Sequence, residues 1–209
     1  CNYGLTETSS IVATESLNKI KMYGSVGKPL YNNRVKIINK DKIRKGLGEV
    51  VINGENLFDG YIKNKFKTNQ VLKKKWLYTG DLGKFDNKGN LYIHERKDNM
   101  IVVSGENIFP TEIEKFLNNH KKIKFSVVVP VEDKITQNKL VLIYETKLKI
   151  SEKELFDFLY KKISVYKIPK IALNCKKIGL AEIPKASNGK ILRKKIINYT
   201  NNFFKFKKL

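Results

Sequence analysis

The sequence predicts an α+β fold, because alternating strand patterns fill its first half and amphipathic helices with longer strands fill its second. Glycine and asparagine separate the strand patterns, whereas Ser/Thr-x-x-Glu sequences precede the helical ones. Four polar residues at 96–99 divide the two halves. We therefore expect a β-rich domain over residues 1–97 and a small α+β domain over residues 98–209.

Branched apolar residues mark the strands that we expect in the first half. They lie in RVKIIN (34–39), GEVVING (48–54) and GNLYIHER (89–96). The sequence DNKGN at 86–90 is typical of a tight turn, because asparagine, aspartate and glycine accept turn conformations. It predicts a hairpin between GKF on one side and LYIHE on the other.

Two capping boxes predict the helices of the second half. Thr111 with Glu114, and Ser151 with Glu154, have the spacing in which each side chain bonds the backbone of the other. Ile150 and Leu155 are placed for a hydrophobic staple around the second box. The remaining elements expected here are strands over 125–131 and 139–147, a short strand near 171–178 and a last helix from about Ile191.

Composition narrows the classes of function. The net charge of +22 invites a nucleic-acid reading, but arginine, which reads bases and grips phosphates best, stands only at positions 34, 44, 96 and 193. The lysines are scattered along the whole chain, so we expect a solvated surface and no specific nucleic acid. No apolar run reaches the roughly 18 residues of a membrane span. Cys1 and Cys175 lie in no metal or disulfide pattern, which favours a reducing cytoplasm.

Four short segments contain the residues most suited to chemistry. They are YGLTE (3–7), YTGDLG (78–83), ERKDNMIVVSGENIFPTEIE (95–114) and IPKASNGKILRK (183–194). Together, in this order, they resemble the adenylate-forming superfamily, which includes acyl-CoA synthetases, adenylation domains that load carrier proteins, and luciferases. GEVVINGENLFDGYIKN adds the Gly-Glu…Gly…Gly-Tyr segment of that family. The resemblance extends from Tyr3 to at least Arg193.

The resemblance implies a nucleotide site in the first half. Tyr3 would stack on adenine, Thr6 would bind a phosphate oxygen and Glu7 would bind Mg²⁺. Asp81 would accept the hydroxyls of the ribose, and Arg96 would donate to the same sugar or to a phosphate. Without the resemblance, each has an ordinary alternative: a packed tyrosine, a loop cap for the Thr-Glu pair, a turn aspartate and a surface ion pair between Arg96 and Glu95. Glu95 itself departs from the family, which usually has glycine there.

The resemblance also assigns roles in the second half. Asp98 matches the hinge position, and Gly105 matches a glycine that lets a pantetheine arm pass close to the backbone. Lys190 matches the catalytic lysine, an ammonium group placed between a carboxylate and the α-phosphate of ATP. Asn188-Gly189 would present it on a turn. Lys185 would only support it; the alternative for each lysine is a solvated surface cation.

The implied reaction is carboxylate activation by MgATP followed by transfer of the acyl group to a thiol, with CoA favoured as acceptor. The family's upstream phosphate loop and most of its acyl pocket have no counterpart in these 209 residues. The resemblance therefore implies the C-terminal part of a longer ligase, which forms no adenylate without its missing N-terminal part. An adenylation domain that loads a carrier protein, and a non-catalytic basic module that binds nucleic acid, stay as alternatives.

Overall fold

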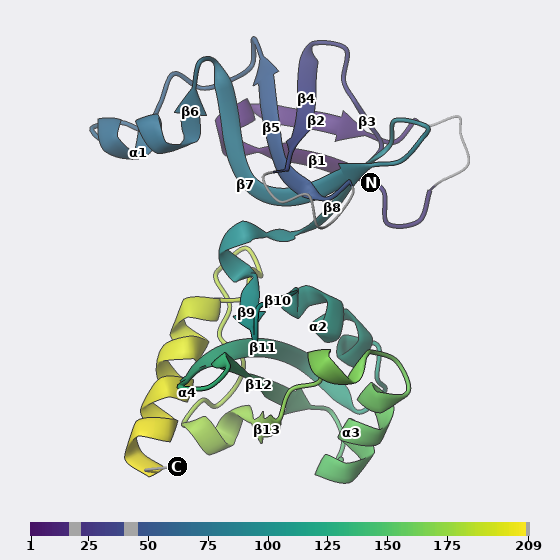
Figure 1. Cartoon of the computed structure of the whole chain (residues 1–209), viewed down its shortest axis with the longest axis vertical. Coiled ribbons are helices and arrows are strands. Elements are labelled where there is room, and N and C mark those ends of the chain that lie inside the picture. Colours follow the sequence, from purple (N-terminus) through teal and green to yellow (C-terminus); the bar gives the residue numbers. More distant parts are fainter. Residues whose placement is uncertain (17–21, 40–45, 208–209) are drawn as a thin grey trace. The chain divides into compact units, whose positions relative to one another are not determined.

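The computed structural model describes residues 1–16, 22–39 and 46–207. The chain forms two compact units, Cys1–Asp98 and Asn99–Leu209 (Figure 1). Both contain helices and strands, so the predicted α+β class is confirmed. The predicted domains, residues 1–97 and 98–209, stay a prediction, and so does the role of Asp98 as the hinge between them.

The first unit consists of two antiparallel sheets. A three-stranded sheet has the order β1-β2-β3, and a five-stranded sheet has the order β4-β5-β7-β6, with β8 also paired to β7. The elements are β1 (Asn2–Leu5), the 3₁₀ turn η1 (Thr6–Thr8), β2 (Ser10–Thr14), β3 (Lys28–Pro29), β4 (Asn33–Ile38), β5 (Gly48–Gly54), α1 (Lys65–Val71), β6 (Leu72–Lys73), β7 (Trp76–Phe85) and β8 (Leu91–Arg96).

A shared apolar core joins the two sheets of the first unit. Val12 of β2 packs with Val50 and Ile52 of β5, and all three are fully buried. Tyr3 and Leu5 of β1 lie against the same core. Because this packing holds β1 onto the larger sheet, residues at the beginning of the chain can reach β7 and β8.

The predicted hairpin around 86–90 is present. Its strands β7 and β8 pair from Phe85 with Leu91 back to Asp81 with Arg96. The carboxylate of Asp86 accepts hydrogen bonds from the backbone amides of Lys88 and Asn90, at 2.9 and 2.8 Å. The bonds to Asn90 lead the causes that lower the pKa of Asp86. The turn fixes the register of the pair near Phe85, and an irregularity between Leu82 and Gly83 shifts it by one residue, which sets Asp81 opposite Arg96.

The second unit is built on the hairpin of β11 (Ile123–Asp133) and β12 (Gln137–Thr146), with β13 (Ile171–Asn174) parallel to β12. A two-stranded sheet of β9 (Ile101–Val103) and β10 (Glu106–Ile108) precedes it. The other elements are η2 (Lys97–Asn99) at the junction of the units, α2 (Pro110–Asn118), α3 (Glu152–Tyr160), η3 (Val165–Lys167), η4 (Cys175–Ile178) and α4 (Arg193–Lys207).

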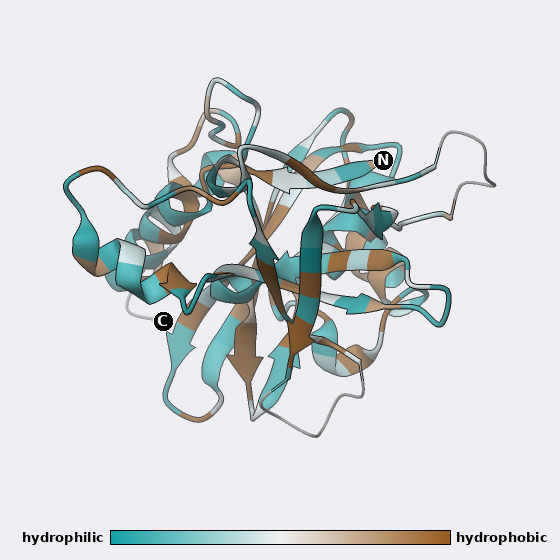
Figure 2. Ribbon diagram, turned by 90° about the horizontal axis from the view of Figure 1, so that it is seen from above, coloured by the Kyte–Doolittle hydropathy of each residue, from teal (hydrophilic) through white to brown (hydrophobic). Residues whose placement is uncertain are grey.

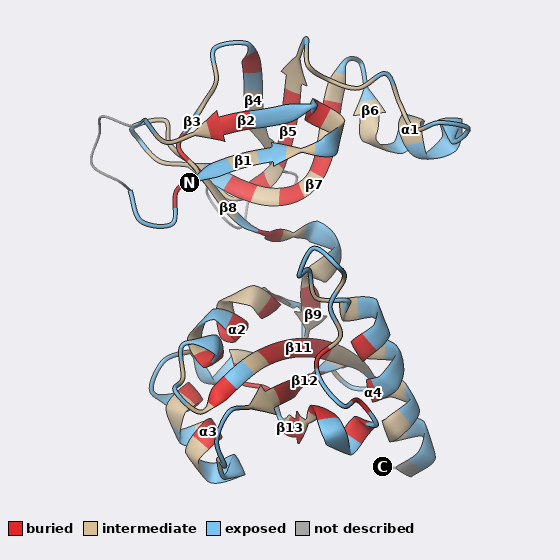
Figure 3. Ribbon diagram, turned by 180° about the vertical axis from the view of Figure 1, so that it is seen from behind, coloured by how far each residue is buried: buried red, intermediate tan, exposed pale blue. Residues whose placement is uncertain are grey.

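The alternation of β11 explains the layers of the second unit. Val128 faces a core that includes residues of α2 and α3, whereas Val127 and Val129 face a second core that includes Ile196 of α4. The central strands are therefore buried on both faces, which Figure 3 shows as red stretches along β11 and β12. Figure 2 shows apolar stretches in brown along the strands and helices of the chain, interrupted by teal hydrophilic ones. None of the helices in the described residues combines the length and apolar character that crossing a bilayer requires.

The two predicted capping boxes have different outcomes. Ser151 caps α3, because its hydroxyl accepts from the Glu154 amide at 3.1 Å. The box at Thr111 is wrong: α2 begins at Pro110, its N-cap residue is Phe109, and Thr111 lies inside the helix. Proline at the first helical position favours this earlier start, and the Glu114 side chain is bonded elsewhere.

The last helix begins two residues later than predicted. Ile191 pairs with Lys185 in an isolated β-bridge, and α4 starts at Arg193. The backbone amide of Leu192 donates to the Pro184 carbonyl at 2.9 Å, which continues the bridge. The segment around Lys190 is consequently a loop with two paired arms, and no helix begins directly behind the lysine.

The Ser151 cap provides a test of the second unit. Ser151→Ala leaves the Glu154 amide without its acceptor and should lower the free energy of unfolding by about 1 kcal/mol. Ser151→Asn is the matched control, because asparagine caps as well as serine and should leave stability close to wild type. Urea unfolding followed by circular dichroism measures both. Equal losses in the two variants would contradict the capping role.

Candidate functional site

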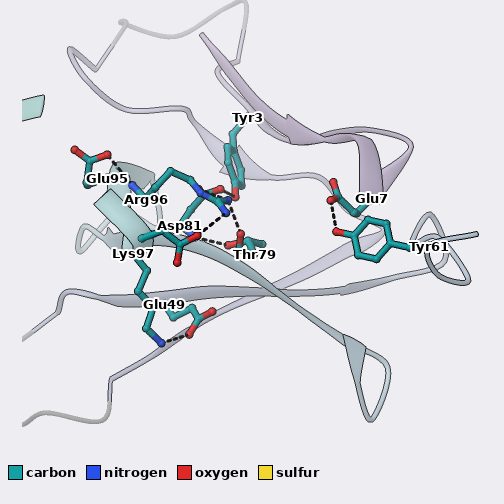
Figure 4. Close-up of polar contacts among 10 residues, drawn as sticks. Tyr3, Glu7, Glu49, Tyr61, Thr79, Asp81, Glu95, Arg96 and Lys97 are labelled. Carbon is teal, nitrogen blue, oxygen red and sulfur yellow. Dashed lines mark hydrogen bonds and ion pairs between the residues drawn. The ribbon is translucent and has the colours of Figure 1, made fainter. Parts of the chain in front are cut away.

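Asp81 is the centre of a polar network in the first unit (Figure 4). It lies within β7 and not in a turn, and it is 6% exposed. Its Oδ2 accepts from the Tyr3 hydroxyl at 2.5 Å, and its Oδ1 accepts from Arg96 Nη1 at 3.1 Å. Its backbone amide donates to the Thr79 hydroxyl at 3.0 Å. A buried carboxylate with these donors is held in one orientation.

Arg96 reaches Asp81 across the β7–β8 pair. Its Nη1 also donates to the Thr79 carbonyl at 2.6 Å, and its Nη2 lies 3.8 Å from Asp98 Oδ2. Gly80 leaves room for the guanidinium, since a Cβ there would lie 3.0 Å from Nη2, and its φ of +72° suits glycine. The Arg96 side chain is 42% exposed against 8% for that of Asp81. The guanidinium thus has one edge fixed and another open for a ligand.

Glu95, where the resembled family has glycine, does not disturb this network. Its side chain accepts from the Arg96 backbone amide at 2.9 Å, and the residue is 5% exposed. The guanidinium of Arg96 pairs with Asp81, and its backbone amide pairs with Glu95. The carboxylate supports the end of β8 from beside the site.

Tyr3 is fixed at both ends of its side chain. Its ring packs against the core of Val12, Val50 and Ile52, and its hydroxyl binds Asp81. Burial first, and then the charge and hydrogen bond of Asp81, raise the pKa of Tyr3. Each carboxylate oxygen can accept more than one hydrogen bond, so Asp81 keeps capacity for further donors. The two residues therefore offer an oriented ring beside an oriented acceptor.

Thr6 and Glu7 lie on η1, which is held in place by the loop that follows β5. The Thr8 and Glu7 carbonyls accept from Asn56 Nδ2 at 2.8 Å and from the Phe58 amide at 2.9 Å. The Tyr61 hydroxyl donates to Glu7 Oε1 at 2.6 Å. Thr6, which precedes Glu7 in the chain, is exposed. The sequence interpretation missed Tyr61, although it lies in the Gly-Tyr segment that the resemblance quoted.

The donor set around Glu7 fits a magnesium ion that is shared with phosphates. In the described parts of the chain, no three His, Cys, Asp or Glu side chains gather closely enough to bind a metal by themselves. Mg²⁺ commonly takes one or two protein carboxylates and completes its shell with water and substrate phosphates. The Glu7 carboxylate, whose Oε1 accepts from Tyr61, is the kind of single carboxylate that this arrangement would use.

Lys190 lies at the tip of a loop in the second unit. The Gly189 amide donates to the Ala186 carbonyl at 2.8 Å, and the Ala186 amide donates to the Lys190 carbonyl at 2.8 Å. The Lys190 amide donates to Asn188 Oδ1 at 3.1 Å, and Gly189 has a φ of +80°. The turn expected at Asn188-Gly189 is thus present, and the exposed lysine extends from an ordered backbone.

Gly105 and Asp98 occupy exposed turns. Ser104 and Gly105, with φ of 51° and 81°, form the two-residue turn between β9 and β10. A Cβ on Gly105 would meet nothing within 4 Å, so the described structure requires glycine there for its φ and not for space. Asp98 lies in η2, and its side chain is 83% exposed. The structure brings together Tyr3, Asp81 and Arg96, while Lys190 and Gly105 belong to the other unit.

The pair of Tyr61 with Glu7 gives a pH-dependent prediction. Burial and the Glu7 carboxylate raise the pKa of Tyr61 from 10.0 to about 12. This contact therefore stabilises the fold below about pH 10, and the contribution is lost as the pH rises through 12. Glu7→Gln should shift the pKa back toward 10, which ¹³C NMR of the tyrosine ring would measure, with Tyr61→Phe assigning the signal. An unchanged pKa in Glu7→Gln would contradict the contact.

Comparison with known proteins shows what the sequence and the fold of this chain are similar to. The family described as AMP-binding enzyme matches residues 1–62. A 2-succinylbenzoate–CoA ligase of Bacillus cereus is 35% identical over 199 residues, which cover 93% of this chain and 40% of the relative. The chain thus spans about 40% of the length of the curated relatives it matches.

Solved structures agree with the sequence relatives. The o-succinylbenzoate CoA synthetase of Bacillus subtilis, in complex with its acyl-adenylate intermediate, has a TM-score of 0.82 at 31% identity, covering 93% of this chain and 40% of that chain. The same synthetase with ATP and a magnesium ion has a TM-score of 0.80, with the same identity and coverage. The matched family, the relatives and the solved structures agree: the chain is similar to adenylate-forming, AMP-binding enzymes.

Proposed function

We propose that the chain is the C-terminal part of an AMP-forming acid–thiol ligase, which activates a carboxylic acid with ATP and transfers the acyl group to CoA. The observation that carries this proposal is the contact of Tyr3, Asp81 and Arg96, three residues from three strands of the first unit. They supply an aromatic face, a fixed acceptor and a partly open donor. Adenosine monophosphate offers matching groups in its base, its ribose hydroxyls and its phosphate.

The candidate site residues of the first unit each have a role in this proposal. Asp81 accepts from the ribose hydroxyls, the ring of Tyr3 lies against the adenine and the open edge of Arg96 donates to the sugar or phosphate. Thr6 binds a phosphate oxygen, and Glu7 would hold Mg²⁺. When bound, the ion would supply positive charge to the phosphates.

Lys190 provides the cation for the first chemical step. A carboxylate oxygen of the acid attacks the α-phosphorus of ATP, the bond to the pyrophosphate oxygen breaks, and an acyl-adenylate forms. Two anions approach each other in this step, so an ammonium group between them lowers the barrier. The ordered backbone beneath Lys190 supports this role, because a preorganised charge costs little reorganisation when the reaction occurs.

The second step uses the Gly105 turn of the second unit. The thiol sulfur of CoA attacks the acyl carbon, the bond to the phosphate oxygen breaks, and AMP leaves. In this proposal the chain turns at Asp98 between the steps, so that Lys190 withdraws and the Gly105 turn faces the pantetheine arm. The exposed position of Asp98 in the short η2 segment suits such a joint.

The relatives suggest where to begin with the substrates. Because they are 2-succinylbenzoate–CoA ligases, 2-succinylbenzoate is the first acid to test, with CoA as the first acceptor. A phosphopantetheinyl carrier protein is the alternative acceptor. An enzyme that consumes ATP and CoA would act in the cytoplasm, where both are available.

Lys190→Ala tests the proposal in the ligase that contains this chain. Adenylate formation, measured by ATP–pyrophosphate exchange, should fall by about 10²–10³-fold, because the charge that stabilises the transition state is lost. Thioester formation from supplied acyl-adenylate should change little. Lys194→Ala, which removes another exposed lysine four residues away, should leave both steps near wild type.

Measuring the two half-reactions separately also shows which results would overturn the proposed function. Equal losses in both steps would exclude a role of Lys190 that is confined to adenylate formation. Efficient transfer to a phosphopantetheinylated carrier protein with none to free CoA would exclude the acid–CoA ligase in favour of carrier loading. No exchange activity with any acid in the wild-type ligase would contradict the proposed function as a whole.

A further inference from the structure

Glu114 is a buried acidic residue for which the proposed reaction gives no role. It is 5% exposed, and its carboxylate accepts from both Nη atoms of Arg193, at 2.7 and 2.9 Å. The backbone amide of Val128 donates to the same carboxylate at 2.7 Å, and Arg193 donates to the Val128 carbonyl at 2.8 Å. One ion pair therefore joins α2, β11 and the first residue of α4.

The ion pair lies at one base of the loop that carries Lys190. Arg193 follows the lysine by three residues, and the bridge of Ile191 with Lys185 lies between them. The Leu192 amide donates to the Pro184 carbonyl at 2.9 Å, which closes the two arms of the loop onto each other. A displacement of Arg193 would therefore move the C-terminal arm of the loop.

The other arm is attached to the same hairpin of β11 and β12. The Ile183 amide donates to Glu145 Oε2 at 3.1 Å, and Lys124 pairs with Glu145 Oε1 at 2.5 Å. The ammonium of Lys185 lies over the ring of Phe125. Two carboxylates, Glu145 and Glu114, thus hold the two ends of the loop on one sheet.

The side chain of Lys190 contrasts with this anchored backbone. Among the residues that the structure describes, its ammonium has no ion pair, and it is exposed. The ammonium is therefore available to a ligand, while the position of the Lys190 Cα, from which the side chain extends, is set by the ordered backbone. In the described structure, the hydrogen bonds at the tip join residues of the loop to each other. The placement of the loop on the unit therefore depends on the anchors at its base.

We infer that Glu114 is a positioning residue: its forked ion pair with Arg193 fixes the base of the Lys190 loop for the adenylation step. This inference rests on the proposed function of Lys190. The bidentate geometry is what suits the pair to this task, because two parallel hydrogen bonds fix orientation as well as distance. A buried ion pair is weak evidence for the stability of a fold. What this pair provides is a fixed orientation and distance between α2 and the start of α4.

Glu114→Gln in the intact ligase tests the inference. The amide keeps the size of the side chain and one acceptor, but it loses the charge and one half of the fork. Hydrogen exchange at the Ala186, Gly189 and Leu192 amides should become about tenfold faster, while β11 and β12 keep their protection, because only the loop is released. Adenylate formation should fall by about tenfold to a hundredfold, since small misplacements of a catalytic group have costs of that order. Thioester formation from acyl-adenylate should stay near wild type.

Glu112→Gln is the matched control. Glu112 lies on the same helix and pairs with Lys167 at 2.7 Å, and it makes no bond to the Lys190 loop in the described structure. The same charge is removed from the same helix, so general electrostatic and stability effects are common to both variants. We expect loop exchange and adenylate formation near wild type in this control.

Arg193→Lys gives a second, independent variant. It keeps the cation but not the fork, so it should also accelerate exchange in the loop and slow adenylate formation, less severely than Glu114→Gln. If Glu114→Gln folds poorly, Arg193→Lys tests the inference in its place. A uniform rise in exchange across β11 and β12 with a loss in both half-reactions would reduce Glu114 to a structural role and overturn the inference.

The outcome separates this inference from the proposed function. If Lys190→Ala leaves adenylate formation intact, the function of Lys190 is wrong, whatever the exchange data show. If Lys190→Ala abolishes the step but Glu114→Gln leaves both the loop and the rate unchanged, only the positioning role is wrong.

Discussion

Carboxylates buried in a protein need cations or several donors beside them, and this requirement organises both units of the chain. Asp81 is buried in the first unit and Glu114 in the second, and each pairs with an arginine. Arginine occurs at only four positions among 42 basic residues, so lysine was by far the more abundant partner. A planar fork can hold a carboxylate and a backbone carbonyl together, as Arg96 does with Thr79 and Arg193 does with Val128. Each pair holds candidate functional residues in position within its own unit.

The regular parts of the fold could be predicted because their side-chain periodicity reflects their burial. The two long strands and the helix after Ser151 are examples, and the alternation of Val127 and Val128 between two cores shows the physical cause. The α1 helix was missed because it contains no buried residue and thus has no apolar stripe to detect. The box at Thr111 failed for another reason, since Glu114 satisfies a capping pattern in the sequence but finds stronger partners in the fold.

The candidate site could be predicted only in part for a similar reason. Motifs that resemble a known family identified Tyr3, Asp81 and Arg96 as candidates, but their contact depends on the packing of two sheets, since Tyr3 and Asp81 are 78 residues apart. Glu7 and Tyr61 are separated by 54 residues, and Glu114 and Arg193 by 79. No local propensity encodes such pairs. Each depends on long-range strand pairing or packing that one sequence does not reveal.

A chain with a net charge of +22 cannot select one lysine by charge alone. An approaching phosphate meets similar ammonium groups over much of the surface, and each is a flexible, hydrated point charge. What distinguishes Lys190 is the backbone beneath it, closed by hydrogen bonds within the turn and attached at both bases to acidic residues. Preorganisation, and not the presence of a cation, is what separates a catalytic charge from a solvated one. In this basic protein, the residues that confer it are therefore two acids at the base of the loop, the buried Glu114 and the half-buried Glu145.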